Sequence, residues 1–260
     1  MWFAGVDVGS ISAEVVIVDE AGAAVAYAIG YTGANSVAAA ERTFEEALHQ
    51  AGLAREQMAQ VISTGYGRAR VPFAGSQVTE ITCHARGAFA EFPGTRTVID
   101  IGGQDSKAIR LDVGGRVQNF QMNDKCAAGT GRFLEVMARA LEVDLVEMGT
   151  LALTSREKVS VSSVCTVFAE SEVVGLIHQG ADKRDIIRGI HAAIADRTRA
   201  LVGRVGIESE VTMTGGVAKN PGVVKELEDR LGQKLNLPVE PQIIGALGAA
   251  LIARDRAMKT

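Results

Sequence analysis

The chain has 260 residues, 47% of them hydrophobic and 22% charged, and a formal net charge of −4. That is enough apolar sequence for a sizeable core and one or two domains. The chain has no clustered lysines and arginines of the kind that bind nucleic acid, no apolar run long enough to span a bilayer and no signal-peptide pattern at its start. We therefore expect a cytoplasmic protein with neither nucleic-acid nor membrane partners.

Short apolar strands and amphipathic helices alternate along the chain. Over the first 96 residues the patterns predict strands at 3–8, 13–19, 25–31 and 60–63 and helices at 36–51 and 80–90. Over the remainder they predict strands at 97–101, 107–113, 117–122 and 211–214 and helices at about 130–141, 144–151, 166–178, 183–205, 219–232 and 245–258.

One pattern occurs twice: an apolar strand that carries an Asp near its end, a glycine turn, and a second strand. The copies cover residues 3–19 and 97–113. Two similar halves that face each other create a cleft, so the sequence predicts a duplicated α/β fold with a nucleotide in the cleft. We expect residues 1–96, completed by the C-terminal helix at 245–260, to form the first half, and 97–244 to form the second.

The two turns, at 7–10 and 100–105, are candidate phosphate loops, because glycine lets backbone N–H groups approach phosphate oxygens closely. Either turn alone would also suit an ordinary hairpin. A third element, the strand that ends at Thr214, runs into paired glycines whose bare backbone would lie flat against adenosine. No Walker A or dinucleotide-binding fingerprint is present. The expected nucleotide-binding residues are Gly9, Ser10, Gly102, Gly103, Gly215, Gly216 and Asn220.

Asp7, Asp100 and Gln104 are the candidate catalytic residues. The two aspartates would hold Mg²⁺, partly through water, and the alternative for them is turn capping. Gln104 would orient the attacking water, as glutamines do in other nucleotide hydrolases, and the alternative is a structural hydrogen bond.

Cys126 and Cys165 each lie just ahead of a predicted helix, where free N–H groups and the helix dipole favour a thiolate. Two such residues suggest metal ligands, and a [4Fe-4S] cluster needs four thiolates, so a second copy of the chain would supply the rest. The alternative is two buried apolar side chains. Cys83 beside His84 offers too few ligands for a metal site, and we expect it to pack in the core.

Residues 3–253 resemble the activators of 2-hydroxyacyl-CoA dehydratases, which are related to the ATPase subunits of benzoyl-CoA reductase. Both belong to the ATPase superfamily of actin, hexokinase and the heat-shock chaperones. The most specific stretches are 102–105, 123–131, 165–172 and 213–218. The resemblance implies two ribonuclease-H-like halves around a cleft for ATP or ADP with Mg²⁺. It also implies a homodimer that shares one [4Fe-4S] cluster between its subunits, with Cys126 and Cys165 at the ligand positions.

The resemblance further implies ATP-driven electron transfer in anaerobic metabolism. A donor such as ferredoxin or flavodoxin would supply a low-potential electron, which passes to an acceptor iron–sulfur enzyme such as a 2-hydroxyacyl-CoA dehydratase. One departure is Glu14, where the family often has lysine. The sequence does not identify the acyl-CoA substrate of the partner enzyme. The main alternative is a small-molecule kinase of the same fold, which gives no reason for the two cysteines; a nucleotide-gated assembly module would need an additional domain.

Overall fold

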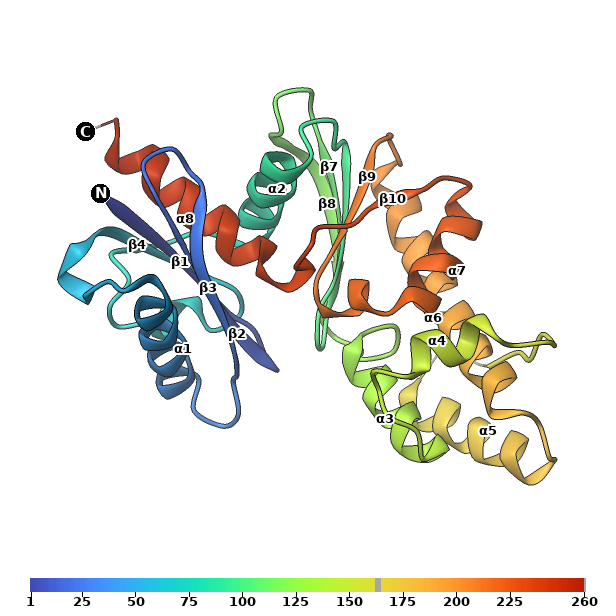
Figure 1. Ribbon diagram of the computed structural model, residues 1–260. Helices are drawn as coiled ribbons and strands as arrows, with labels where there is room; N and C mark the ends of the chain where they lie inside the picture. Colours follow the sequence, from blue (N-terminus) through green and yellow to red (C-terminus); the bar gives the residue numbers. More distant parts are fainter. Residues whose placement is uncertain (162–164, 260) are drawn as a thin grey trace.

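Two five-stranded mixed sheets with helices packed against them make up the computed structural model (Figure 1). The structure describes residues 1–161 and 165–259. Ser162, Ser163 and Val164, which lead into the helix predicted after Cys165, lie outside the described residues. Cys165 itself and the helix that follows it are described.

The first sheet contains β1 (Trp2–Val8), β2 (Ser12–Val18), β3 (Ala24–Tyr31), β4 (Met58–Thr64) and β5 (Ser76–Gln77). Their order is β3-β2-β1-β4-β5. The central strand β1 is antiparallel to β2 and parallel to β4. Both β1 and β2 are buried over almost their whole length, which explains why their sequences are nearly continuous apolar runs rather than alternating ones.

The second sheet contains β6 (Thr97–Ile101), β7 (Ser106–Leu111), β8 (Val117–Asn123), β9 (Val211–Thr214) and β10 (Leu235–Asn236). Their order is β10-β9-β6-β7-β8, with β6 antiparallel to β7 and parallel to β9. Position by position this repeats the first sheet, with β6 in the place of β1. The duplicated α/β fold predicted from the sequence is therefore confirmed.

Helices cover the sheets and fill the space beyond the second one (Figure 1). Helix α1 packs on β2 and β3, α8 packs on β1, β2 and β4, and α2 lies between α8 and the second sheet. The helices are α1 (Ser36–Ala51), α2 (Glu80–Glu91), α3 (Gly131–Leu141), α4 (Met148–Leu153), α5 (Thr166–His178), α6 (Lys183–Val205), α7 (Pro221–Leu231) and α8 (Ile244–Ala257).

Glycines allow α8 to approach β1 and α2 at backbone contact. A Cβ on Gly5 of β1 would lie 1.9 Å from the carbonyl oxygen of Ala246, and one on Gly248 would lie 1.8 Å from that of Cys83. Backbone atoms at these positions cannot move aside, so only glycine fits. The C-terminal helix therefore packs on the first sheet, and the division into residues 1–96 with 245–260 and residues 97–244 stays a prediction.

Two local features differ from the sequence-based expectations. The helix expected from residue 144 begins only at Met148, because Glu142 ends α3 in the left-handed conformation (φ 52°) and the following Leu145 and Val146 are exposed in a turn. The two-residue strands β5 and β10 were not predicted, because so short a run carries no periodicity of its own.

Candidate nucleotide-binding site

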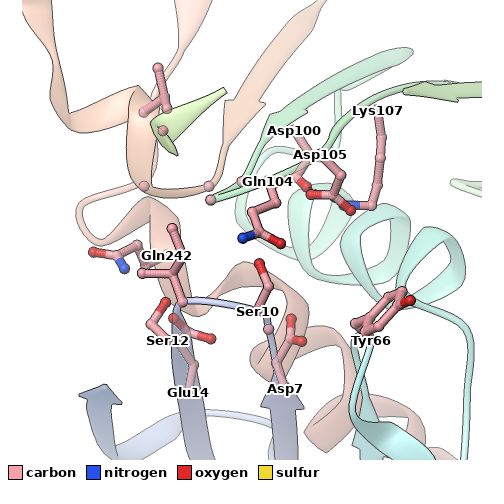
Figure 2. A pocket seen from close by; sticks show the side chains of 18 of the residues that line it. Asp7, Ser10, Ser12, Glu14, Tyr66, Asp100, Gln104, Asp105, Lys107 and Gln242 are labelled. Atoms are coloured by element: carbon pink, nitrogen blue, oxygen red, sulfur yellow. Dashed lines mark hydrogen bonds and ion pairs between the residues drawn. The ribbon is translucent and has the colours of Figure 1, made fainter. Parts of the chain in front are cut away.

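A cavity of about 840 Å³ is lined by residues of both halves (Figure 2). The ends of β1 and β6 and the turns that follow them form its centre. Every residue predicted from the sequence to act on nucleotide lines this cavity: Asp7, Gly9, Ser10, Asp100, Gly102, Gly103, Gln104, Gly215, Gly216 and Asn220. The fold thus brings the three separate sequence elements together, while the role of each residue in binding or catalysis stays a prediction.

The two candidate phosphate loops have equivalent geometry. The N–H of Gly9 donates to the carbonyl of Ser12 at 2.9 Å, and the N–H of Gly102 donates to the carbonyl of Asp105 at 3.0 Å. The loops also face each other, since a Cβ on Gly103 would lie 2.6 Å from Cδ1 of Ile11. A polyphosphate between them would be approached from both sides by backbone N–H groups.

Lys107 forms ion pairs with two carboxylates of the second loop. Its Nζ lies 3.0 Å from Oδ2 of Asp100 and 2.7 Å from Oδ2 of Asp105, and 3.3 Å from Oε2 of Glu80 on α2. The lysine side chain is only 3% exposed. Its own pKa is raised, because the three carboxylates outweigh the effect of burial. Sequence reasoning missed Lys107, since nothing in the local pattern shows that its side chain points inward.

Asp100 is held ionised by this network. Burial alone would raise the pKa of Asp100, but His84, Lys107 and a hydrogen bond from Thr214 together lower it to about 2. The Thr214 hydroxyl donates to Oδ1 of Asp100 at 3.0 Å. The second half therefore presents a fixed negative charge at the end of its central strand.

Asp7 lies in a different environment at the equivalent place in the first half. Burial raises the pKa of Asp7 to about 6 in spite of the opposing effect of His84. The residue opposite Asp7 in the β1–β2 register is Glu14, whereas the residue opposite Asp100 in the β6–β7 register is Lys107. Burial, followed by the charge of Asp7, raises the pKa of Glu14 well above its usual value.

These carboxylates fit a magnesium ion. Mg²⁺ prefers oxygen ligands and is commonly held by one or two carboxylates together with phosphate oxygens and water. Asp7 and Asp100 both line the cavity and belong to opposite halves. A divalent cation would favour the ionised form of Asp7, which burial in the metal-free protein disfavours.

His84 lies between the two aspartates, although it comes from α2. Its Nδ1 lies 3.1 Å from Oγ1 of Thr214 and 3.5 Å from Oδ1 of Asp100, and its Nε2 lies 3.9 Å from Oδ2 of Asp7. Because the Thr214 hydroxyl donates to Asp100, its oxygen accepts the hydrogen bond from Nδ1–H. His84 thus contacts both halves of the site, a role that its sequence position beside Cys83 did not indicate.

Asn220 directly precedes α7 and lines the cavity. Its Oδ1 accepts hydrogen bonds from the N–H groups of Gly222 and Val223, both at 3.0 Å, and caps that helix. Its Nδ2 lies 3.3 Å from Nε2 of His191 on α6. Burial lowers the pKa of His191 to about 3, so the imidazole is neutral and its Nε2 accepts from the amide.

The three cysteines occupy two kinds of environment. Cys83 is fully buried, and burial raises the pKa of its thiol to about 12, as expected for a packing role. Cys165 is the N-cap residue of α5, and Cys126 lies in the turn that leads to α3; both are half-buried. Helices α3 and α5 pack against each other. Across residues 1–161 and 165–259, no three His, Cys, Asp or Glu side chains converge on a single metal site.

The fold and this cavity can be compared with known proteins. A sequence profile of the BadF/BadG/BcrA/BcrD ATPase family matches residues 4–253. The chain belongs to this family. It is 46% identical to the activator of lactoyl-CoA dehydratase from Anaerotignum propionicum, with 100% of both proteins covered. The family resemblance seen in the sequence is therefore confirmed.

Two solved structures are close to this one. Component A of the Acidaminococcus fermentans (R)-2-hydroxyglutaryl-CoA dehydratase has a TM-score of 0.96 and 46% identity, over 99% of each chain. The activator of the 2-hydroxyisocaproyl-CoA dehydratase from Clostridium difficile, solved with bound ADPNP, has a TM-score of 0.95 and 46% identity, over 100% of this chain and 96% of that one.

Among the helices that the structure describes, none combines the length and the apolar composition of a membrane-spanning segment.

The opposite environments of Asp7 and Asp100 predict opposite effects on stability. Above pH 6 the ionised Asp7 destabilises the nucleotide-free fold, because its folded pKa is raised, so Asp7→Asn should increase the free energy of unfolding at pH 8. Asp100 stabilises the fold above its unfolded pKa, because its folded pKa is lowered, so Asp100→Asn should decrease that free energy. Changes of about 1–3 kcal/mol are expected from shifts of this size. Urea unfolding at pH 8 measures both changes in the free energy of unfolding, with the exposed Asp144→Asn as the control.

The Asp7→Asn and Asp100→Asn variants should both lose Mg²⁺-dependent ATP hydrolysis. Normal hydrolysis in both would mean that the active site lies elsewhere.

Neutral, buried His191 predicts sensitivity to acid. Between the unfolded value of 6.5 and the folded value of about 3, the unfolded chain binds one more proton, so stability falls as the pH is lowered. The slope is about 1.4 kcal/mol per pH unit for one group. In His191→Gln this contribution should disappear from urea unfolding measured between pH 6.5 and pH 5. The exposed His49→Gln should keep the wild-type slope, and an unchanged slope in His191→Gln would contradict the assignment.

Proposed function

We propose that this protein is the ATP-dependent activator of a 2-hydroxyacyl-CoA dehydratase, and that it delivers a low-potential electron from a [4Fe-4S] cluster shared by two copies of the chain. The observation that carries the proposal is a backbone connection between the cavity and the segment of Cys126. The N–H groups of Gly131 and Arg132, which begin α3, donate to the carbonyls of Gly102 and Gly103 at 2.9 and 2.7 Å. A movement of the second phosphate loop would thereby be transmitted to the start of α3.

The cysteines fit an iron–sulfur cluster that lies between two chains. Cys126 and Cys165 are half-buried, near the starts of two helices that pack together, whereas Cys83 is enclosed in the core. Two thiols per chain are half of what a cluster with four thiolate ligands needs. When bound, such a cluster would accept and pass on single electrons. Cys126 and Cys165 of each subunit would hold it on the dimer axis.

Helix α5 supports an interface at this place. It is apolar over most of its length, yet only Ala169 and Val173 are buried. Val167 and Phe168, which follow Cys165 directly, are 66% and 70% exposed. Large apolar side chains at such exposure mark interaction surfaces. A second copy of the chain, packed here, would cover them and exclude water from the cysteines.

The residues of the cavity would then work as a switch. ATP with Mg²⁺ would draw the turn after β1 toward the turn after β6, and the hydrogen bonds to Gly131 and Arg132 would carry the shift to α3. Gln104, which lines the cavity beside Ser10 (Figure 2), would orient the attacking water, and hydrolysis would return the loops to their open positions. A difference in affinity for ATP between the two shapes is what drives such a change.

The partners follow from the same proposal. A small electron carrier such as ferredoxin or flavodoxin would reduce the cluster, and a 2-hydroxyacyl-CoA dehydratase or a related iron–sulfur reductase would accept the electron, all in the cytoplasm. The sugar- or acid-kinase alternative rests on the shared fold alone, since it assigns no role to Cys126 and Cys165.

The ligand assignment is tested by serine variants of the three cysteines. Cys126→Ser and Cys165→Ser should each bleach the anaerobically purified brown protein, because a shared cluster loses two of its four thiolates in a homodimer. Cys83→Ser is the matched control and should remain brown. Iron analysis of the wild type should give about four Fe per dimer. A full cluster in a strict monomer would contradict the proposal.

The link between the two sites is tested by removing one hydrogen bond. Iron release to a chelator should differ several-fold between the ADP state and a non-hydrolysable ATP state, in line with typical coupling of about 1–3 kcal/mol. Gly131→Pro removes the N–H that donates to Gly102 and suits the first position of a helix, so it should reduce this difference. Gly131→Ala keeps the N–H and is the matched control. Equal release rates in the two nucleotide states of the wild type would rule out communication.

A further inference from the structure

The cations that line the cavity differ in whether an acidic side chain already neutralises them. Lys107 contacts three carboxylates, and Nζ of Lys219 lies 2.8 Å from Oε1 of Glu240. Arg68 also lines the cavity. In the part of the chain that the structure describes, its guanidinium has no carboxylate partner and donates only to a backbone carbonyl, that of Gly65, from Nη1 at 3.0 Å. Among the lysines and arginines that line the cavity in the described part of the chain, Arg68 therefore has a charge that no carboxylate neutralises. This charge is available to a ligand.

The loop that carries Arg68 is fixed to the end of β1. The N–H of Gly67 donates to the carbonyl of Val8 at 2.8 Å, and the Ser63 hydroxyl donates to the carbonyl of Arg68 at 2.9 Å. Gly65 has φ +83°, and a Cβ on it would lie 2.3 Å from Oδ1 of Asp7. The backbone that leads into Arg68 thus lies directly against the end of β1, and the carbonyl of Arg68 itself is hydrogen-bonded to β4. An arginine on so rigid a support is preorganised for a ligand beside Asp7.

The cavity has two ends, and the loop that carries Tyr66 and Arg68 lies at the end away from the paired glycines. In Figure 2, Gln242 and the labelled Tyr66 lie on opposite sides of the group formed by Asp7, Ser10 and Gln104. Gln242 belongs to the glycine end, since a Cβ on Gly216 would lie 3.6 Å from its side chain. If the nucleoside lies at the glycine end and the first phosphates between the loops, the last phosphate points toward the loop of Tyr66 and Arg68.

We propose that Arg68 binds the terminal phosphate of ATP and is the residue by which the site distinguishes ATP from ADP. The inference rests on the proposed function, because it takes the cavity as the ATP site. Arginine carries a permanent charge and a planar set of five N–H donors that match phosphate oxygens. ADP would leave these donors unused. Because the loop of Arg68 contacts Asp7, a terminal phosphate bound by Arg68 would lie close to Asp7 and to a Mg²⁺ held there.

The test is a comparison of two nucleotides in variants of two neighbouring arginines. Dissociation constants for Mg-ADPNP and Mg-ADP are measured by calorimetry on the anaerobically purified, cluster-loaded protein. Arg68→Gln should weaken ADPNP by about tenfold or more, as expected for lost charge-assisted hydrogen bonds, and leave ADP unchanged within about twofold. Arg68→Lys should restore part of the ADPNP affinity. Arg70→Gln removes the same charge two residues away, from an exposed side chain that does not line the cavity, and should change neither constant.

The possible outcomes separate this inference from the proposed function. Equal weakening of ADPNP and ADP in Arg68→Gln, or no weakening of either, would overturn the role of Arg68 while leaving the ATP site intact. A wild-type protein that binds neither nucleotide would instead contradict the proposed function. Thermal unfolding without nucleotide checks that each variant is folded, and Arg68→Lys provides the readout if Arg68→Gln is unstable.

Discussion

The two halves meet around buried carboxylates, and the pairing of each carboxylate governs the electrostatics of the site. Each central strand ends in an aspartate that is almost inaccessible to water, and removing an ion from water costs several kcal/mol unless it is paired. Asp100 is paired with Lys107 and receives the Thr214 hydrogen bond, whereas the basic partner of Asp7 within residues 1–161 and 165–259 is the more distant His84. The nucleotide-free fold is thus stabilised at one aspartate and destabilised at the other, and a cation that arrives with a nucleotide would relieve the second.

The duplication preserves the backbone while making the two phosphate loops electrically different. Position 14 on β2 and position 107 on β7 are equivalent in strand order and register, yet one is Glu and the other Lys. The first hairpin therefore pairs two carboxylates and the second pairs a carboxylate with an ammonium. Two identical halves would bind two identical groups, but a nucleotide is asymmetric along its length. The difference at these positions gives the cavity a direction.

Backbone hydrogen bonds join the cavity to the segment that carries Cys126. The second phosphate loop accepts from the first two N–H groups of α3, groups that a helix always leaves without an internal partner. Because a helix is rigid along its axis, a shift at its start moves the whole element and the turn before it. Helix α3 also packs on α5, so the segment of Cys165 would share the movement. Coupling of this kind needs no side-chain relay, only two discrete positions of one loop.

Local pattern in the sequence determined the duplicated architecture, nearly all elements and the three loops of the cavity. The hydrophobic periodicity of helices and strands and the chemistry of turns both act over a few residues. The two copies of one pattern at 3–19 and 97–113 reveal a repeat without any tertiary information. Which polar side chains meet in the site follows from how distant segments pack against one another. His84, Lys107 and Arg68 come from segments with no motif of their own, and they reach the cavity because α2, β7 and the loop after β4 are packed against its walls. Which charge is neutralised and which is left for a ligand depends on contacts between residues far apart in the chain. Periodicity does not encode such contacts.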